Sequence, residues 1–186
     1  LDKCDDLVHI LGACNCVWLD AESNLRGTNT DWAGVYEAIL AATPDHIDGR
    51  VAMVYGAGGA SRAVIYALWA KLGCSKIYLL NRDEEEVLEL IDDVHRLPRM
   101  YWPEVVHVKT LAQCKDLSAP YYTVCAVPDL EATTMREIYA ESIFVELLSK
   151  ENAAGALVLD MCYHPPMTKN LRLAAKYGYK TIQGQI

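Results

Sequence analysis

The strongest constraint in this sequence is a glycine-rich turn between an apolar segment and a helical pattern. Residues 51–55 (VAMVY) form a continuous apolar run of strand length, and Gly56-Ala57-Gly58-Gly59-Ala60 follows directly. A helical pattern then continues to Leu72, and Gly73 follows as a helix-ending residue. A buried strand, a turn of small residues and a helix, in this order, predict the first unit of a parallel α/β sheet.

The same turn has the features of a phosphate-binding loop. Gly56 permits a tight turn and Gly58 allows a pyrophosphate to approach the backbone, while Ser61 stands where a third glycine is usual. The start of the helix offers N–H groups and a positive dipole end to an anion. The cofactor-binding residues predicted here are Gly56, Ala57, Gly58, Gly59 and Ala60. The alternative is a turn whose glycines serve backbone geometry alone.

A charged run, Asn81-Arg82-Asp83, follows the next apolar strand at residues 76–80. In a dinucleotide-binding fold this position faces the adenosine ribose, where an acid binds the 2′- and 3′-hydroxyls and a basic residue binds a 2′-phosphate. Arg82 and Asp83 therefore favour opposite cofactors. The glutamates at 84–86 extend the negative charge, which repels a phosphate dianion, so the run favours NAD over NADP. Asp83 could also simply cap the next helix.

Strands and helices alternate to the end of the chain. Further strands are expected at residues 105–108, 123–127, 157–161 and 179–182, and further helices at 84–95, 133–149 and 168–176. Apolar strands without polar alternation are buried on both faces. The pattern predicts an α/β fold with a doubly wound parallel sheet, a Rossmann-like dinucleotide-binding domain over residues 31–186. Residues 98–103 are expected to be a surface loop.

The segment before this pattern is different in character. Residues 1–11 are typical of the end of an amphipathic helix, and residues 14–19 are an apolar run that ends in a polar turn. Residues 28–31 (TNTD) then resemble a helix start, with Thr or Asp as the N-cap of a helix closed by Pro44.

Composition excludes several classes of protein. The net charge is −8 and the 17 Lys and Arg residues are scattered, which argues against direct nucleic-acid binding. The apolar runs are strand-sized, far short of the roughly 18 residues of a membrane span. Seven cysteines without paired ligand spacing predict reduced thiols and no metal site. With no targeting segment at its start, the chain is expected in the cytoplasm.

Four motifs resemble the shikimate and quinate dehydrogenases, especially the fungal members. They are Gly12-Ala13-Cys14-Asn15, residues 27–34 (GTNTDWAG), residues 56–63 (GAGGASRA) and residues 160–165 (DMCYHP). Residues 81–83 and 125–128 resemble the fungal quinate branch, and the resemblance extends over nearly the whole chain. It implies an enzyme of two domains that moves a hydride between a nicotinamide cofactor and a quinate- or shikimate-class substrate.

The resemblance also implies roles for individual residues. Asp31 matches a catalytic aspartate that works beside a lysine of an amino-terminal domain, and Asn15 matches a residue that hydrogen-bonds substrate hydroxyls. Tyr163 and Gly184 match positions lining the nicotinamide and substrate cleft, and Val127 is assigned to the cofactor. Each residue also has a purely structural alternative: Asp31 as a helix cap, Asn15 as a turn residue and Tyr163 as a packing aromatic.

Departures from the family pattern define the expected domain organisation. Residues 1–30 are expected to be the remnant of a junction with a substrate domain that is absent from this chain, so the 186 residues alone should be inactive. Cys16 stands where the family has threonine. A second hypothesis is that the chain is a sensor. It would be the effector-binding domain of a fungal quinate-pathway repressor, which binds a regulatory protein and acts in the nucleus. A third, a domain of a multifunctional aromatic-pathway polypeptide, resembles the chain less well at 81–83 and 162–164.

Overall fold

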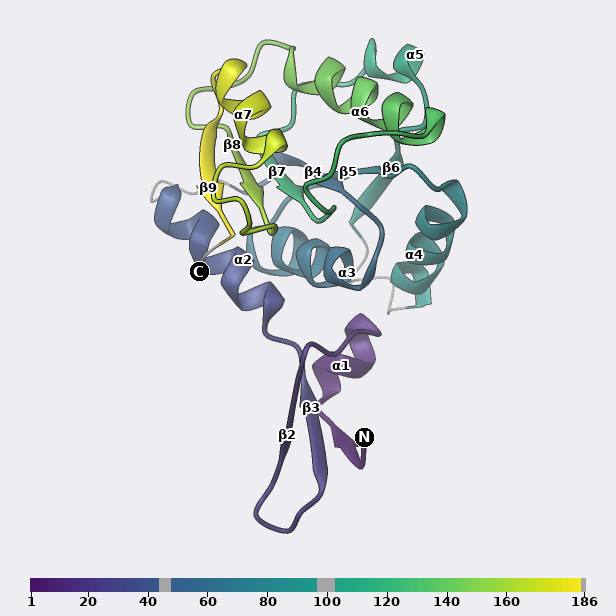
Figure 1. The fold of residues 1–186 in the computed structure, drawn as a ribbon, viewed down its shortest axis with the longest axis vertical. Coiled ribbons are helices and arrows are strands. Elements are labelled where there is room, and N and C mark those ends of the chain that lie inside the picture. The colour runs from purple at the N-terminus through teal and green to yellow at the C-terminus, as the bar shows by residue number, and fades with distance from the viewer. Residues whose placement is uncertain (44–47, 97–102, 185–186) are drawn as a thin grey trace.

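The computed structural model describes residues 1–43, 48–96 and 103–184. Figure 1 shows an α/β body, from which a slender extension formed by the first thirty residues projects. Pro44, expected to close a helix, and most of the loop expected at 98–103 lie outside the described residues.

A six-stranded, fully parallel sheet forms the centre of the body, with strand order β6-β5-β4-β7-β8-β9. Its strands are β4 (Val51–Tyr55), β5 (Lys76–Leu80), β6 (Glu104–His107), β7 (Tyr122–Cys125), β8 (Leu157–Asp160) and β9 (Lys180–Gln183). The expected strands are all present, within three residues at either end. From β4 the chain adds β5 and β6 on one side of the sheet, and from β7 it adds β8 and β9 on the other. The carboxyl ends of the neighbouring strands β4 and β7 therefore form the topological switch point.

Helices cover both faces of the sheet, which confirms the doubly wound prediction (Figure 1). The helices packed on one face are α2 (Asp31–Ala42), α3 (Gly59–Tyr66) and α4 (Glu84–Arg96), and those on the other are α5 (Leu111–Cys114), α6 (Met135–Leu148) and α7 (Lys169–Lys176). The single helix expected through Leu72 is α3 continued by a π-helical segment, Ala67–Lys71. Gly73 follows it with a φ of +59°, as expected of a helix-ending glycine.

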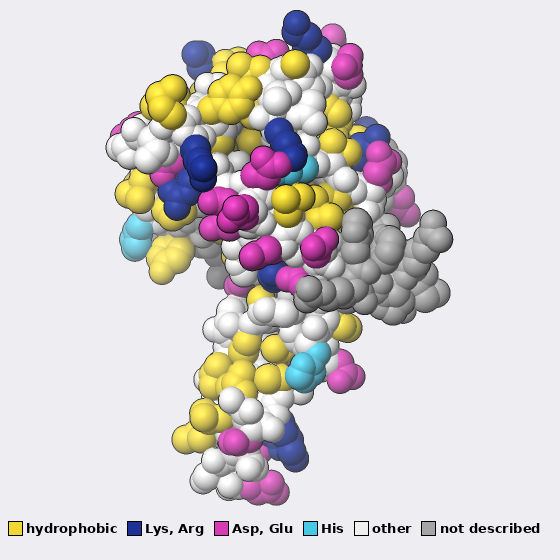
Figure 2. All heavy atoms as spheres, turned by 90° about the vertical axis from the view of Figure 1, so that its right-hand side faces the viewer, with side chains coloured by type: hydrophobic (Ala, Val, Ile, Leu, Met, Phe, Trp, Pro, Cys, Tyr) yellow, Lys and Arg dark blue, Asp and Glu magenta, His cyan; other side chains and the backbone are white. Residues whose placement is uncertain are grey.

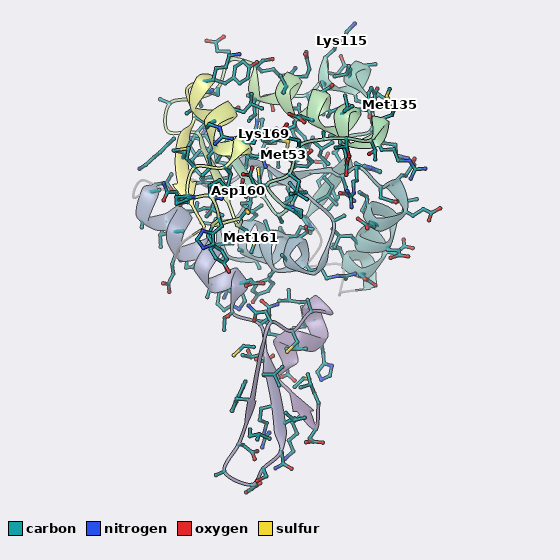
Figure 3. All side chains as sticks on the ribbon, viewed as in Figure 1. Met53, Lys115, Met135, Asp160, Met161 and Lys169 are labelled. Carbon is teal, nitrogen blue, oxygen red and sulfur yellow. The ribbon has the colours of Figure 1, made fainter. Side chains whose placement is uncertain are left out.

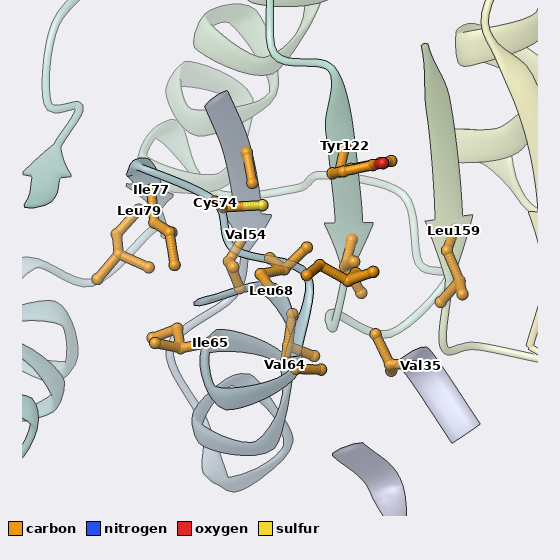
Figure 4. Packing of buried hydrophobic residues seen from close by; sticks show 14 of the residues in the cluster. Val35, Val54, Val64, Ile65, Leu68, Cys74, Ile77, Leu79, Tyr122 and Leu159 are labelled. Atoms are coloured by element: carbon orange, nitrogen blue, oxygen red, sulfur yellow. The ribbon is translucent and has the colours of Figure 1, made fainter. Parts of the chain in front are cut away.

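The two cores explain why the strands are continuously apolar. Val54 of β4 and Leu159 of β8 belong to one core, together with Val64 of α3 and Leu68 of the π-helical segment (Figure 4). Met53, next to Val54 in β4, faces the opposite core and packs with Phe144 of α6. Successive strand residues point to opposite faces, and here both faces are covered, so apolar residues are favoured at every position of the strand.

The extension holds a separate small sheet of order β1-β3-β2, built from β1 (Lys3–Cys4), β2 (Cys16–Leu19) and β3 (Leu25–Thr28). The prediction of a helix from residue 1 is wrong for residues 1–5: β1 pairs with β3, and Asp5 caps the short helix α1 (Asp6–Leu11) by accepting from the Val8 N–H at 2.8 Å. Apolar side chains of the hairpin, among them Val17 and Leu19, are exposed (Figure 2). The extension therefore presents apolar surface that this chain itself does not cover.

We predict that Leu68→Ala lowers the free energy of unfolding by about 2–5 kcal/mol, because Leu68 is fully buried and its loss leaves a cavity against the sheet. Leu88→Ala is the control, since Leu88 lies on α4 with 47% of its surface exposed and should cost far less. Urea denaturation followed by circular dichroism measures both. Equal costs for the two variants would contradict the packing described here.

Candidate functional site

The glycine turn lies at the switch point, and its first glycine is required by the protein itself. Gly56 has a φ of +126°, and a Cβ there would lie 2.8 Å from the Ala126 carbonyl oxygen at the end of β7. Its N–H donates to the Leu80 carbonyl at 2.8 Å. Any side chain at this position would push the ends of the central strands apart, so Gly56 serves backbone geometry.

Gly58 is different. It adopts φ −77° and ψ −170°, which any residue can adopt, and a Cβ there would meet no described atom within 4 Å. It is the N-cap of α3 and makes no side-chain capping bond. Neither strain nor packing against the described residues calls for glycine here. The alternative of a purely conformational turn therefore does not explain Gly58, whereas a ligand approaching the N–H groups of α3 does.

A pocket opens beside this turn at the carboxyl edge of the sheet. Its lining residues come from the turn, the end of β5, the loop after β7, and helices α4, α6 and α7: Tyr55, Gly56, Ala57, Gly58, Asn81, Arg82, Glu86, Ala126, Val127, Pro128, Leu130, Glu131, Ala132, Glu137, Glu141, Lys169 and Asn170. Six of the nine predicted cofactor residues are among them. Gly59, Ala60 and Asp83 are not: the first two lie in the first turn of α3.

Fixed charges occupy one wall of the pocket. Glu137 accepts hydrogen bonds from the N–H groups of Thr134 at 2.9 Å and Thr133 at 3.0 Å, and forms an ion pair with Arg82. These interactions, the two backbone bonds first, lower the pKa of Glu137 to about 2. Nearby, Lys169 Nζ donates to Glu141 at 3.1 Å. Lys169 extends from α7 (Figure 3).

Asn81 and Arg82 line both the pocket and a neighbouring hollow, whereas Asp83 lines the hollow alone. Asn81 lines the pocket and donates to Glu86 Oε2 at 2.6 Å. Asp83 accepts from the Glu85 N–H at 2.9 Å and lies 3.7 Å from Arg136, beside a neighbouring hollow. The alternative in which Asp83 caps the next helix is thus present in the structure. The carboxylates that line the pocket belong to other residues.

Asn15 and Asp31, which were predicted to share a substrate site, are in direct contact. Asn15 Nδ2 donates to Asp31 Oδ1 at 2.5 Å, and Asn15 Oδ1 accepts from the Thr30 N–H at 2.9 Å. The alternative of Asp31 as a helix cap is wrong: the N-cap is Thr30, and the Asp31 N–H donates to the Asn29 side chain at 3.1 Å. The Asp31 carboxylate is therefore not engaged in capping α2.

This pair is tied to the glycine turn through Ala13. The Asn29 side-chain amide donates to the Ala13 carbonyl at 3.2 Å, and a Cβ built on Gly59 would lie 3.9 Å from the Ala13 Cβ. The segment that carries Asn15 thus packs against the start of α3. Asn15, Asp31, Asn29, Ala13 and Gly59 thus belong to one continuous set of contacts.

Tyr163 and Gly184 lie near the carboxyl ends of β8 and β9. A Cβ on Gly184 would lie 2.5 Å from the Asp160 carbonyl oxygen, so the strand ends approach closely there. Asp160, buried below them, accepts from Thr168 Oγ1 at 2.6 Å and from the Cys162 N–H at 3.0 Å (Figure 3). Burial raises its pKa. These bonds fix both ends of the loop that carries Tyr163, whose ring remains 55% exposed.

Sequence reasoning missed Glu137, Glu141 and Lys169, which lie far along the chain from the glycine turn. One signal was available for Glu137: Thr134 and Glu137 have the spacing of a capping box, which places the glutamate in the first turn of α6. That turn lies at the carboxyl edge of a parallel sheet, where ligands bind.

Two negative observations apply to the described residues only. They contain no group of three or more His, Cys, Asp or Glu side chains arranged to hold a metal ion. Among the same residues, no helix has the length and apolar character needed to cross a bilayer.

The fold is that of a Rossmann-like α/β domain, with a pocket beside its glycine turn. No protein-family model matches the chain. Quinate dehydrogenase of Emericella nidulans is 35% identical, with the match covering 99% of this chain and 59% of that protein. The pentafunctional AROM polypeptide of Candida glabrata is 30% identical over 99% of this chain and 11% of its own length.

Solved structures agree with these relatives. Dehydroquinate dehydratase and shikimate dehydrogenase from S. pombe AroM has a TM-score of 0.78 at 29% identity, covering 99% of this chain and 34% of that one. Quinate dehydrogenase from Corynebacterium glutamicum, in complex with NAD, has a TM-score of 0.74 at 26% identity, covering 99% and 61%. The chain is similar to the C-terminal part of shikimate and quinate dehydrogenases, as the motifs predicted.

Acid sensitivity follows from Glu137. Because its folded-state pKa, about 2, lies below the ordinary value of 4.5, its charge stabilises the fold above about pH 4.5, and this contribution is lost as pH falls toward 2. We predict that Glu137→Gln lowers the urea midpoint at pH 7 and that the difference from wild type narrows at pH 3. An equal difference at both pH values would show that the charge of Glu137 does not stabilise the fold.

Proposed function

We propose that this site binds a nicotinamide dinucleotide, with the pyrophosphate over Gly58 at the start of α3. The observation that carries the proposal is the open space at Gly58, a glycine whose own backbone and neighbours do not require one. An anion there would accept from the N–H groups of the first turn of α3, which no side chain caps. The adenosine end would extend toward Asn81 and Arg82, which line the same pocket.

Our finer proposal is that the cofactor is NAD rather than NADP. Arg82 is paired with Glu137, and Glu86 lies on the same wall of the pocket, so a 2′-phosphate would meet carboxylates. The quinate dehydrogenase of Corynebacterium glutamicum was solved with NAD, which supports this choice.

We further propose that the parent protein transfers a hydride between this cofactor and a quinate- or shikimate-class substrate. A carbinol that loses hydride must also lose its hydroxyl proton, and Asp31 is the candidate to take or relay it. Asn15, bonded to Asp31 and exposed, would orient the substrate hydroxyls. Tyr163 and Gly184 would line the cleft between the substrate and the nicotinamide.

The division of the chain is part of the same proposal. Residues 31–186 would form the cofactor domain and residues 1–30 a junction with a substrate domain. The separate small sheet of the extension and its exposed apolar side chains support this division. The chain spans about three-fifths of the length of the quinate dehydrogenase that it matches, at 59%. Substrate binding is therefore proposed for the whole protein.

We predict that Gly58→Ala weakens NADH binding by roughly tenfold or more, since a methyl group would hold the pyrophosphate away from the α3 N–H groups. The fold should be unaffected, because the backbone angles suit alanine and the space is open. Fluorescence titration of NADH measures binding and a thermal melt checks the fold. Wild type that shows no saturable signal up to millimolar NADH would refute the cofactor proposal.

We predict that the 186 residues alone do not oxidise quinate or shikimate, since Asp31 is proposed to act beside a lysine of the substrate domain. In the full-length parent, Asp31→Asn should lower turnover by roughly 10² to 10⁴ and leave NADH affinity nearly intact. Steady-state kinetics and NADH titration measure the two effects separately. A parent that binds quinate but reduces no NAD, with Asp31 present, would identify the sensor rather than the enzyme.

A further inference from the structure

We propose that Glu137 sets the cofactor preference of this site by holding Arg82 away from a 2′-phosphate. The inference rests on the proposed dinucleotide function and goes further, since it assigns the discrimination to a residue on α6 rather than to the acidic run after β5. Glu137 and Arg82 are 55 residues apart in sequence and line the same pocket.

The carboxylate of Glu137 is held in a fixed position. It is the third residue of α6 and completes a capping box with Thr134. One oxygen, Oε2, accepts from the N–H groups of Thr133 and Thr134 and from the Thr133 hydroxyl at 3.3 Å. The side chain is 21% exposed. Because three donors hold the Glu137 carboxylate, its position does not depend on Arg82. The position of the Arg82 side chain depends on Glu137 instead.

The other oxygen, Oε1, receives the guanidinium of Arg82. The Arg82 side chain is long and 61% exposed, so its position depends on the charge it pairs with. The lowered pKa of Glu137 keeps this charge in place at neutral and mildly acidic pH. In this arrangement the basic residue of the ribose-facing run is already neutralised.

A 2′-phosphate and a 2′-hydroxyl would experience this wall differently. The dianion needs an unpaired cation, and here it would have to displace Glu137 from Arg82 while lying close to Glu86. A neutral hydroxyl can donate to a carboxylate and requires no displacement. This wall of the pocket therefore favours the binding of NAD over that of NADP.

The acidic run explains less of the preference than its position suggests. Asp83 caps α4, and Glu84 is paired with Lys109. Glu85 lines the neighbouring hollow, as Asn81 and Arg82 also do, but it does not line the pocket and has no ion pair with Arg82 among the described residues, which makes it a matched control. Glu85→Gln removes the same charge from the ribose-facing region without touching Arg82.

The test is fluorescence titration of NADH and NADPH on the 186-residue protein and its variants. The wild-type protein should bind NADH more tightly than NADPH. Glu137→Gln should raise NADPH affinity about three- to tenfold and change NADH affinity less than about twofold, because glutamine keeps an acceptor for the cap but leaves Arg82 uncompensated. Glu85→Gln should behave as wild type. The rise in NADPH affinity should disappear in the double variant that carries both Glu137→Gln and Arg82→Gln.

The outcomes separate the two proposals. Wild type that binds neither cofactor, though folded, refutes the dinucleotide function itself. Wild type that binds NADH, with equal NADPH gains in the Glu137 and Glu85 variants, leaves the function standing and overturns the role of Glu137. If Glu137→Gln fails to fold, Arg82→Gln alone decides: a strong loss of NADPH affinity would show that Arg82 already serves the phosphate, against the proposal, whereas a change below about twofold supports it.

Discussion

The close approach of Gly56 to the end of β7 is the constraint on which the site depends. At the switch point the chain must turn sharply out of β4 while the neighbouring strand ends against it, and only a residue without a side chain fits beside the Ala126 carbonyl. That turn points the start of α3 along the carboxyl edge of the sheet. The uncapped N–H groups of α3, the pocket beside them and the open space at Gly58 follow from this geometry.

The contrast between the two glycines separates folding from function. Gly56 is explained entirely by a positive φ and a backbone contact, and it would be needed in a protein with no ligand. Gly58 has neither reason. Two neighbouring glycines of one turn therefore differ: the fold requires the first and does not require the second, which is why the cofactor proposal rests on Gly58.

The sheet could be predicted because its strands are covered on both faces, and continuous apolar runs such as residues 51–55 leave no other placement. The start of the chain could not. Residues 1–5 follow an amphipathic pattern that suits a helix, but β3 offers an unpaired edge and β1 takes it. The short α5 was also missed, since it has a single turn and owes its start to a capping box at Thr110.

In the site, local patterns were predictable and distant contacts were not. The turn and Asn81-Arg82 lie where strand ends place them, and the Asn15–Asp31 contact agrees with the motif resemblance. Arg82 lies between β5 and α4 and its partner Glu137 lies on α6, and the periodicity of the sequence does not predict such a pairing. The block of charges at 83–86 favours the same cofactor, but Asp83 caps α4 and Glu84 pairs with Lys109, while Glu86 lines the pocket.

The contacts around Ala13 suggest how the two halves of the site act together. Ala13 lies against Gly59 on one side, and its carbonyl accepts from Asn29 on the other, just before the residues that carry Asn15 and Asp31. An anion bound at the α3 start would therefore lie one layer of side chains from the substrate-side pair. The segment that carries Asn15 is therefore positioned by its contact with the start of α3. The proposed hydride transfer would require such a shared frame, since two reactants must be held at contact distance.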